Sequence, residues 1–267
     1  MRNIWTALIL AAALLTLCSC GAGGRKPEDQ KPEASESGHT TEHSYEYAVV
    51  HPAYLEENDM NTEEINCWGD SITEGYGSDG LTYPDVLRQL TGMPVRNLGV
   101  GGEDSSEILS RSIDYGSQEE DILVIQMGDN GGWRNLNQLI RQYRELISEA
   151  GTDRYIIISS TDDPNDFEQI WGYTTEPVGL ENTWYEEEFE EAFGEHLFNG
   201  RKYLIEHGLE INGIRRTEED YMRADQGNIS LKLRNPEYGD NTHLNEAGYI
   251  ALAHGVYEKG KELGYWH

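Results

Sequence analysis

The sequence predicts an α/β fold, a three-layer α/β/α sandwich built on a central parallel sheet. Short apolar runs typical of strands alternate along the chain with segments of helical periodicity. The most apolar run, residues 121–127 (DILVIQM), has the composition of a parallel strand that is covered on both faces. A chain of 267 residues with 37% hydrophobic residues is long enough for one globular domain.

Strands and helices are expected in turn, each with local signals at its ends. Strands are predicted at residues 65–68, 95–98, 121–127 and 155–159. Helices are predicted at residues 83–91, 104 to about 113, about 136–150, from about 185, and from 245 toward 263. Pro84 suits a first helical turn, Asp104 and Glu107 form a capping box, and Gly151 supplies a helix stop.

The first residues read as an export signal. Arg2 precedes an apolar run at residues 4–17, which is 14 residues long and therefore too short for the roughly 20 residues that span a bilayer. The run ends in Leu-Cys-Ser-Cys-Gly, which resembles the bacterial lipobox. That resemblance implies cleavage after residue 19 and a lipid anchor, such as palmitate, on Cys20; Cys18 fits less well because bulky Leu17 precedes it. The alternative is an ordinary secretory signal with incidental cysteines.

Three segments are therefore expected: a signal peptide at residues 1–19, a polar tether at 20–46 and a catalytic-size domain at 47–267. The tether is rich in Gly, Lys, Pro, Glu, Ser and Thr, which is typical of a solvated linker. Outside the signal region Cys67 is the only cysteine, so the domain has no internal disulfide. Cys67 is expected to be a small buried hydrophobic residue.

The charge balance excludes one class of partner. Lys and Arg number 20 and Asp and Glu 49, which gives a formal net charge of −29. Nucleic-acid binding needs a basic surface, so DNA and RNA are excluded as partners. Such an acidic domain would also repel anionic lipid head groups, so the membrane is expected to be contacted through the anchor on Cys20.

Polar and glycine-rich residues follow three of the predicted strands. Gly69-Asp70-Ser71 follows the first strand, where a tight turn exposes a serine hydroxyl, so Ser71 is a candidate nucleophile. Gly102 follows the second strand, and its backbone N–H is a candidate oxyanion donor. Asn130 follows the third and most buried strand, and its carboxamide is a second candidate donor.

A carboxylate and an imidazole stand three residues apart near the C-terminus, in Asp240-Asn-Thr-His243. On a turn they can lie side by side, so that Asp240 fixes the tautomer of His243 and stabilises its cation. Together with Ser71 they supply a nucleophile, a base and a group that orients the base.

These four blocks, in this order, resemble the SGNH hydrolase superfamily, also called GDSL esterases and lipases. The resemblance spans residues 65–250 and implies a flavodoxin-like α/β/α fold and a serine hydrolase that acts on carboxylic esters without a metal or cofactor. It implies that Ser71 attacks the ester, that His243 takes its proton and that Asp240 orients His243. The N–H groups of Ser71 and Gly102 and the side chain of Asn130 would hold the oxyanion.

Two positions depart from the family pattern. Gly131 stands where the family usually has Asp, so the loop loses its supporting carboxylate unless Asp129 replaces it. Leu244 stands where Pro often follows the histidine. Asp70 is expected to brace the serine turn through backbone hydrogen bonds rather than to move protons.

The expected function is a membrane-tethered esterase on the outer side of a bacterial membrane that removes a short acyl group, such as acetyl, from a glycan or a small ester. A lysophospholipase or thioesterase that acts on lipids is the alternative, and an inactive surface protein that binds glycan is another. Four aromatic residues could either stack on sugar rings or pack against the sheet: Trp171, Tyr173, Trp184 and Tyr185. The sequence leaves the oligomeric state open.

Overall fold

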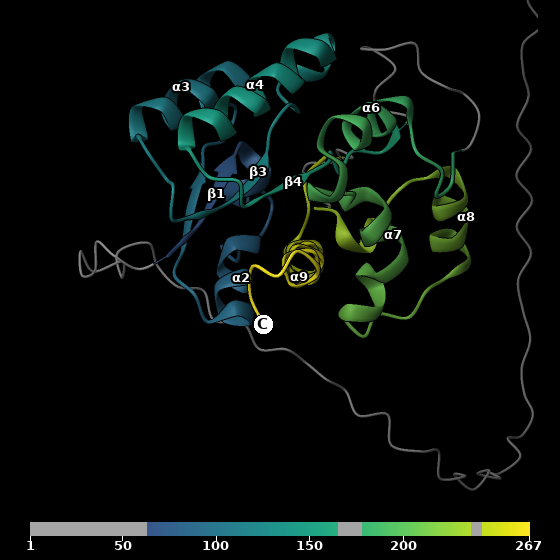
Figure 1. Cartoon of the computed structure of the whole chain (residues 1–267). Helices are drawn as coiled ribbons and strands as arrows, with labels where there is room; N and C mark the ends of the chain where they lie inside the picture. Colours follow the sequence, from purple (N-terminus) through teal and green to yellow (C-terminus); the bar gives the residue numbers. More distant parts are fainter. Residues whose placement is uncertain (1–62, 165–177, 236–241) are drawn as a thin grey trace, which may run out of the picture. The chain divides into compact units, whose positions relative to one another are not determined.

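The computed structural model describes residues 63–164, 178–235 and 242–267 (Figure 1). Cys18 and Cys20, the tether, and Trp171, Tyr173 and Asp240 lie outside the described residues. The predictions made for them are therefore untested.

The central sheet has five strands, each paired in parallel with its neighbours, in the order β2-β1-β3-β4-β5. The strands are β1 (Ile65–Gly69), β2 (Val95–Gly99), β3 (Ile122–Gln126), β4 (Tyr155–Ile158) and β5 (Leu197–Phe198). Every residue of β1 and β3 is buried, which agrees with strands covered on both faces. The predicted α/β/α fold is confirmed, and β5 is a strand that the sequence analysis did not predict.

Helices cover both faces of the sheet (Figure 1). The α-helices are α1 (Ser71–Glu74), α2 (Tyr83–Thr91), α3 (Ser105–Tyr115), α4 (Leu136–Ala150), α6 (Trp184–Phe193), α7 (Gly200–Ile211), α8 (Glu218–Gln226) and α9 (Glu246–Glu262). Side chains of α2, α7 and α9 join Cys67 and Val124 in one apolar core. Side chains of α3, α4 and α6 join Trp68 and Ile125 in a second core on the opposite face.

The helix ends follow the local signals in the sequence. Asp104 accepts hydrogen bonds from the first turn of α3 while Glu107 reaches back to the Asp104 N–H, as a capping box requires. Gly151 ends α4 in the left-handed conformation, with φ +80°. Cys67 is fully buried, as expected, and its burial raises the pKa of its thiol.

The segment from β4 to the last helix holds more structure than its sequence pattern predicts. The Glu-rich helix is α6, and Tyr185 on it packs against Trp133, with ring centroids 4.9 Å apart. Tyr185 is 4% exposed and belongs to the core on this face of the sheet, so for this residue packing is the correct interpretation. Trp184, by contrast, is 43% exposed. Helices α7 and α8 were not predicted, because their apolar residues follow no long amphipathic pattern.

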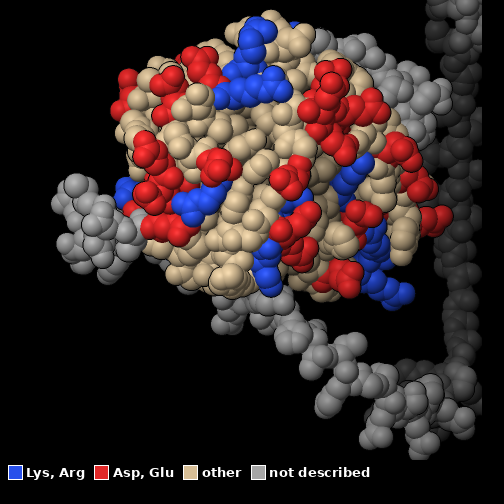
Figure 2. Space-filling view, in the orientation of Figure 1, with Lys and Arg blue, Asp and Glu red and all other residues tan. Residues whose placement is uncertain are grey.

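On the face shown in Figure 2, acidic side chains are spread across the surface with basic side chains between them. Within the described residues, none of the helices is long and apolar enough to cross a bilayer. The same part of the chain contains no group of three or more His, Cys, Asp or Glu residues arranged to hold a metal ion.

Candidate active site

The site lies where β1, β2 and β3 end. Gly69 at the end of β1 pairs in register with Gly99 of β2 and Gln126 of β3. The loops that follow the three strands therefore begin at the same edge of the sheet. This edge is the expected place for a ligand in an open parallel sheet.

Ser71 begins the short helix α1 directly after β1. Asp70 caps this helix, and its Oδ1 accepts a hydrogen bond from the Ile72 N–H at 3.1 Å. Helix α1 lies very close to the strand, because a Cβ at position 69 would lie 2.1 Å from Thr73 Oγ1. Glycine at 69 thus permits the tight turn that presents the Ser71 hydroxyl. The predicted bracing role of Asp70 agrees with its hydrogen bond.

His243 meets Ser71 although the two residues are 172 positions apart in the chain. Ser71 Oγ lies 3.0 Å from His243 Nε2, which is hydrogen-bond distance. The ring of Tyr76 contacts the His243 ring edge to face, with centroids 4.8 Å apart. A hydroxyl in contact with an imidazole can be deprotonated as it attacks an electrophile.

The glycine loop after β2 runs beside the serine and is hydrogen-bonded to Asn130. A Cβ at Gly101 would lie 3.8 Å from Ser71 Cβ, so the glycine loop runs alongside the nucleophile. Gly102 itself is exposed and has a φ of +84°. Asn130 Nδ2 donates a hydrogen bond to the carbonyl oxygen of Glu103, the next residue, at 2.9 Å. A carboxamide has two N–H donors, so the second remains for a ligand atom at this edge.

The two departures from the family pattern have structural explanations. Gly131 has a φ of +101°, a conformation that favours glycine over other residues. The Asp129 carboxylate accepts hydrogen bonds from Gln126 Nε2 at 2.6 Å and Trp133 Nε1 at 2.9 Å, and so braces the loop. Leu244 is fully buried and forms an antiparallel bridge with Arg234.

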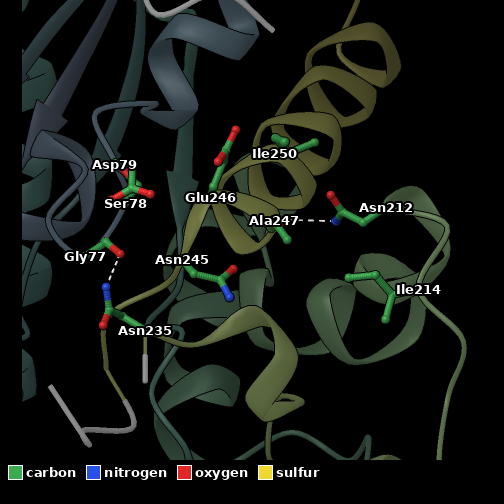
Figure 3. A pocket seen from close by; sticks show the side chains of 10 residues that line it. All are labelled: Gly77, Ser78, Asp79, Asn212, Ile214, Asn235, Asn245, Glu246, Ala247 and Ile250. Atoms are coloured by element: carbon green, nitrogen blue, oxygen red, sulfur yellow. Dashed lines mark hydrogen bonds between the residues drawn. The ribbon is translucent and has the colours of Figure 1, made fainter. Parts of the chain in front are cut away.

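A small cavity of about 230 Å³ adjoins Asn130 between the starts of α3 and α4. All its lining side chains are polar or glycine: Asp104, Ser105, Ser106, Asn130, Gly131, Gly132, Arg134, Asn135, Gln138 and Gln142. A larger pocket of about 550 Å³ lies between Gly77, Asn235 and the start of α9 (Figure 3). Its lining is mainly carboxamides, carboxylates and a hydroxyl with one apolar wall: Gly77, Ser78, Asp79, Asn212, Ile214, Asn235, Asn245, Glu246, Ala247 and Ile250.

This larger pocket adjoins the turn that carries His243. A Cβ at Gly77 would lie 3.3 Å from His243 Cβ, and Gly77 accepts a hydrogen bond from the Asn235 side chain (Figure 3). Sequence reasoning gave no role to Gly77 or to Tyr76. Both follow closely on Ser71, but no local signal indicates that residues 76 and 77 pack against residue 243.

The comparison with protein families decides the classification. The profile of the GDSL-like lipase/acylhydrolase family matches residues 67–251. The chain belongs to this family. Members of the GDSL-like family hydrolyse esters, so the chain is an ester hydrolase. The match begins within β1 and ends within α9, so it includes the Ser71 turn and the His243 turn.

The chain is similar to several solved structures, and the first of those below, at a TM-score of 0.50, shares its fold. A member of the lipolytic G-D-S-L family from Veillonella parvula has 17% identity and a TM-score of 0.50, covering 74% of this chain and 97% of its own. A protein assigned to the same family from Desulfitobacterium hafniense has 15% identity and a TM-score of 0.47, covering 74% and 99%. TesA has 18% identity and a TM-score of 0.46, covering 75% and 99%. No curated protein sequence matches the chain.

Proposed function

We propose that this GDSL-family hydrolase is a serine esterase, tethered outside the cell, that removes short acyl groups from a glycan or a small hydroxylated ester. The observation that carries the proposal is the 3.0 Å contact between Ser71 Oγ and His243 Nε2 beside the Gly102 and Asn130 loops. The contact joins a nucleophile to a base, and the loops bring amide donors to the same place.

Ser71 Oγ attacks the ester carbonyl as His243 Nε2 takes the hydroxyl proton. The resulting oxyanion is held by the N–H groups of Ser71 and Gly102 and by the Asn130 carboxamide. His243 then returns the proton to the leaving alkoxide, which departs as an alcohol and leaves an acyl group on Ser71. Water, deprotonated by His243, hydrolyses that acyl-enzyme. Asp240 is proposed to orient His243 and to stabilise its cation.

The cavity beside Asn130 supports a short acyl group. Asn130, the proposed oxyanion donor, lines this cavity, which measures about 230 Å³. Because every residue that lines it is polar or glycine, the cavity offers a long alkyl chain little apolar surface to bury against. An acetyl group would place only one methyl group in this polar cavity.

The larger pocket supports a hydroxylated alcohol part. Carboxamides can donate and accept hydrogen bonds and carboxylates can accept them, as sugar hydroxyls require, and Ile214 and Ile250 supply an apolar wall (Figure 3). Asp79 and Glu246 add negative charge, which disfavours a phosphorylated head group. A neutral glycan fits this lining better than a phospholipid does.

The experiment offers the purified protein p-nitrophenyl esters from acetate to palmitate, acetylated xylan or peptidoglycan, and lysophospholipid. We expect the rate to fall as the acyl chain lengthens and lysophospholipid to remain intact. A preference for long acyl chains or lysophospholipid would instead establish the lipid hydrolase.

The nucleophile is tested with S71A and a fluorophosphonate probe, which labels activated serines. We expect S71A to lose labelling and to lose activity by about 10⁴-fold or more, because the remaining donors cannot supply a nucleophile. The matched control is S110A, which removes an exposed hydroxyl on α3 and should behave as wild type. If wild type is not labelled and hydrolyses none of the esters, the proposed serine esterase mechanism is wrong.

A further inference from the structure

One buried guanidinium joins three separate parts of the chain beside the active site. Arg234 is 2% exposed. Its Nη1 donates a hydrogen bond to the carbonyl oxygen of Thr242 at 2.8 Å, and its Nη2 donates to the carbonyl oxygen of Thr161 at 2.6 Å. Nη2 also donates to Asp163 Oδ1 at 2.9 Å. Thr161 and Asp163 follow β4, whereas Thr242 immediately precedes His243.

Asp163 holds this guanidinium in a buried ionic cluster. Its side chain is also 2% exposed. Its Oδ1 accepts a further hydrogen bond from the Ile229 N–H at 3.1 Å, and its Oδ2 accepts one from Arg223 Nη2 at 2.5 Å. The buried carboxylate is therefore paired with two guanidiniums and one amide, which offsets the cost of removing its charge from water. Such a cluster has one preferred geometry, because each group is directional.

The backbone near Arg234 holds the histidine turn from its other side. Arg234 and Leu244 form an antiparallel bridge, and the Asn235 N–H donates to the carbonyl oxygen of His243 at 3.2 Å. The Asn245 N–H donates to the carbonyl oxygen of Leu233 at 3.0 Å. Residues 242–245 are thus hydrogen-bonded to residues 233–235. The Arg234 side chain in turn links both segments to the residues that follow β4.

We propose that Arg234, held by Asp163, is a positioning residue that sets His243 within reach of Ser71. The inference rests on the proposed role of His243 as the base. Ser71 directly follows β1, whereas no strand of the described residues leads into His243, so a contact between its turn and a strand end would link its position to the sheet. Arg234 supplies that contact, since its planar fork reaches the Thr242 and Thr161 carbonyls and the Asp163 carboxylate together. Lysine carries the same charge but lacks the fork.

The test replaces Arg234 by lysine in the full chain and compares it with R201K. Arg201 is also fully buried and paired, with Glu186, and it bonds backbone carbonyls, but none belongs to the histidine turn. Each variant replaces one buried guanidinium by an ammonium group, so the two should lose similar free energy of unfolding. Activity on p-nitrophenyl acetate and the rate of fluorophosphonate labelling are measured at a temperature where circular dichroism shows each variant folded.

We expect R234K to lower kcat and the labelling rate by about 10- to 100-fold with little change in KM, because a displacement of about 1 Å costs that much in rate. R201K should keep the wild-type kcat per folded molecule. D163N is nearly isosteric with the wild-type side chain, so it serves as a second variant if R234K does not fold, and it should lower kcat in the same way.

Two outcomes would overturn the proposal. One is an R234K variant, or D163N in its place, with wild-type kcat when folded. The other is a loss of activity that only follows the folded fraction or that equals the loss in R201K. The proposed function fails separately, through absence of activity and labelling in the wild-type protein.

Discussion

At the residue scale, the Asp70 carboxyl caps helix α1, but burying this acidic group costs folding free energy. Its carboxyl is fully buried, and one oxygen accepts the Ile72 N–H. The other, Oδ2, has no hydrogen-bond partner among the described residues. Burial raises the pKa of Asp70 well above its ordinary value, and the nearby charge of Asp129 raises it further.

We therefore predict that D70N is more stable than wild type at neutral pH. Between the ordinary Asp pKa and the raised value, folded wild-type protein binds more protons than unfolded protein, so its stability falls as pH rises through that interval. Asparagine keeps the acceptor for the Ile72 N–H without this dependence. Urea unfolding at several pH values should show the advantage of D70N growing as pH rises above about 4.

The control for this prediction is D79N, which removes an exposed carboxyl and corrects for the change in net charge. A difference between D70N and wild type that stays constant from acid to neutral pH would contradict the assignment.

At the element scale, one ion pair organises the segment between β4 and the histidine turn. The side chains of Arg201 on α7 and Glu186 on α6 are fully buried, and Arg201 Nη2 lies 2.8 Å from Glu186 Oε2. Arg201 also donates to the carbonyl oxygens of Gly179, Glu181 and Gly227. These bonds join two helices and two connecting segments through a single side chain. The pair therefore holds α6 and α7 together with the segments at Gly179 and Gly227.

We predict that R201M lowers the free energy of unfolding by about 3–5 kcal/mol, because it leaves the Glu186 charge buried without its partner. The double variant E186Q/R201M should be less destabilised than the sum of the two single variants, since both charges are then absent. Urea unfolding of the four proteins measures this coupling. Strict additivity would show that the pair contributes nothing specific.

At the scale of the whole molecule, the catalytic domain is proposed to be held outside the cell by a lipid on Cys20 and a polar tether. The proposal rests on the apolar run at residues 4–17 and the motif that ends it. An anchor would keep the domain near wall polymers, which agrees with a glycan ester as substrate. The net charge of −29 opposes direct adsorption to anionic lipids, so an anchor would have to supply the membrane contact.

We predict that the wild-type chain expressed in a bacterial host is found in the membrane fraction and incorporates labelled palmitate. C20A should lose both properties, whereas C18A should retain them. Fractionation and labelling of the three proteins provide the measurement. If C20A stays anchored and labelled, the lipid is attached elsewhere.

The sequence determined the features that depend on neighbouring residues. The strand at residues 65–68, the capping box of Asp104 and Glu107, and the stop at Gly151 were all predicted, because a buried strand, a cap or a turn leaves a signal within a few positions. The contact between Ser71 and His243 was inferred from a resemblance in motif order rather than from any local signal, and the structure brings the two side chains together.

Tertiary structure decided which distant groups support the site. Asp163 looks like an ordinary loop residue in the sequence, and β5 is only two residues long. Arg234 stands in a segment without helical or strand periodicity. The contact from Arg234 to Asp163 joins residues 71 positions apart, and β5 pairs with β4 across 40 positions. No local sequence pattern encodes such a pairing, because it forms only when distant segments pack together at the end of β4.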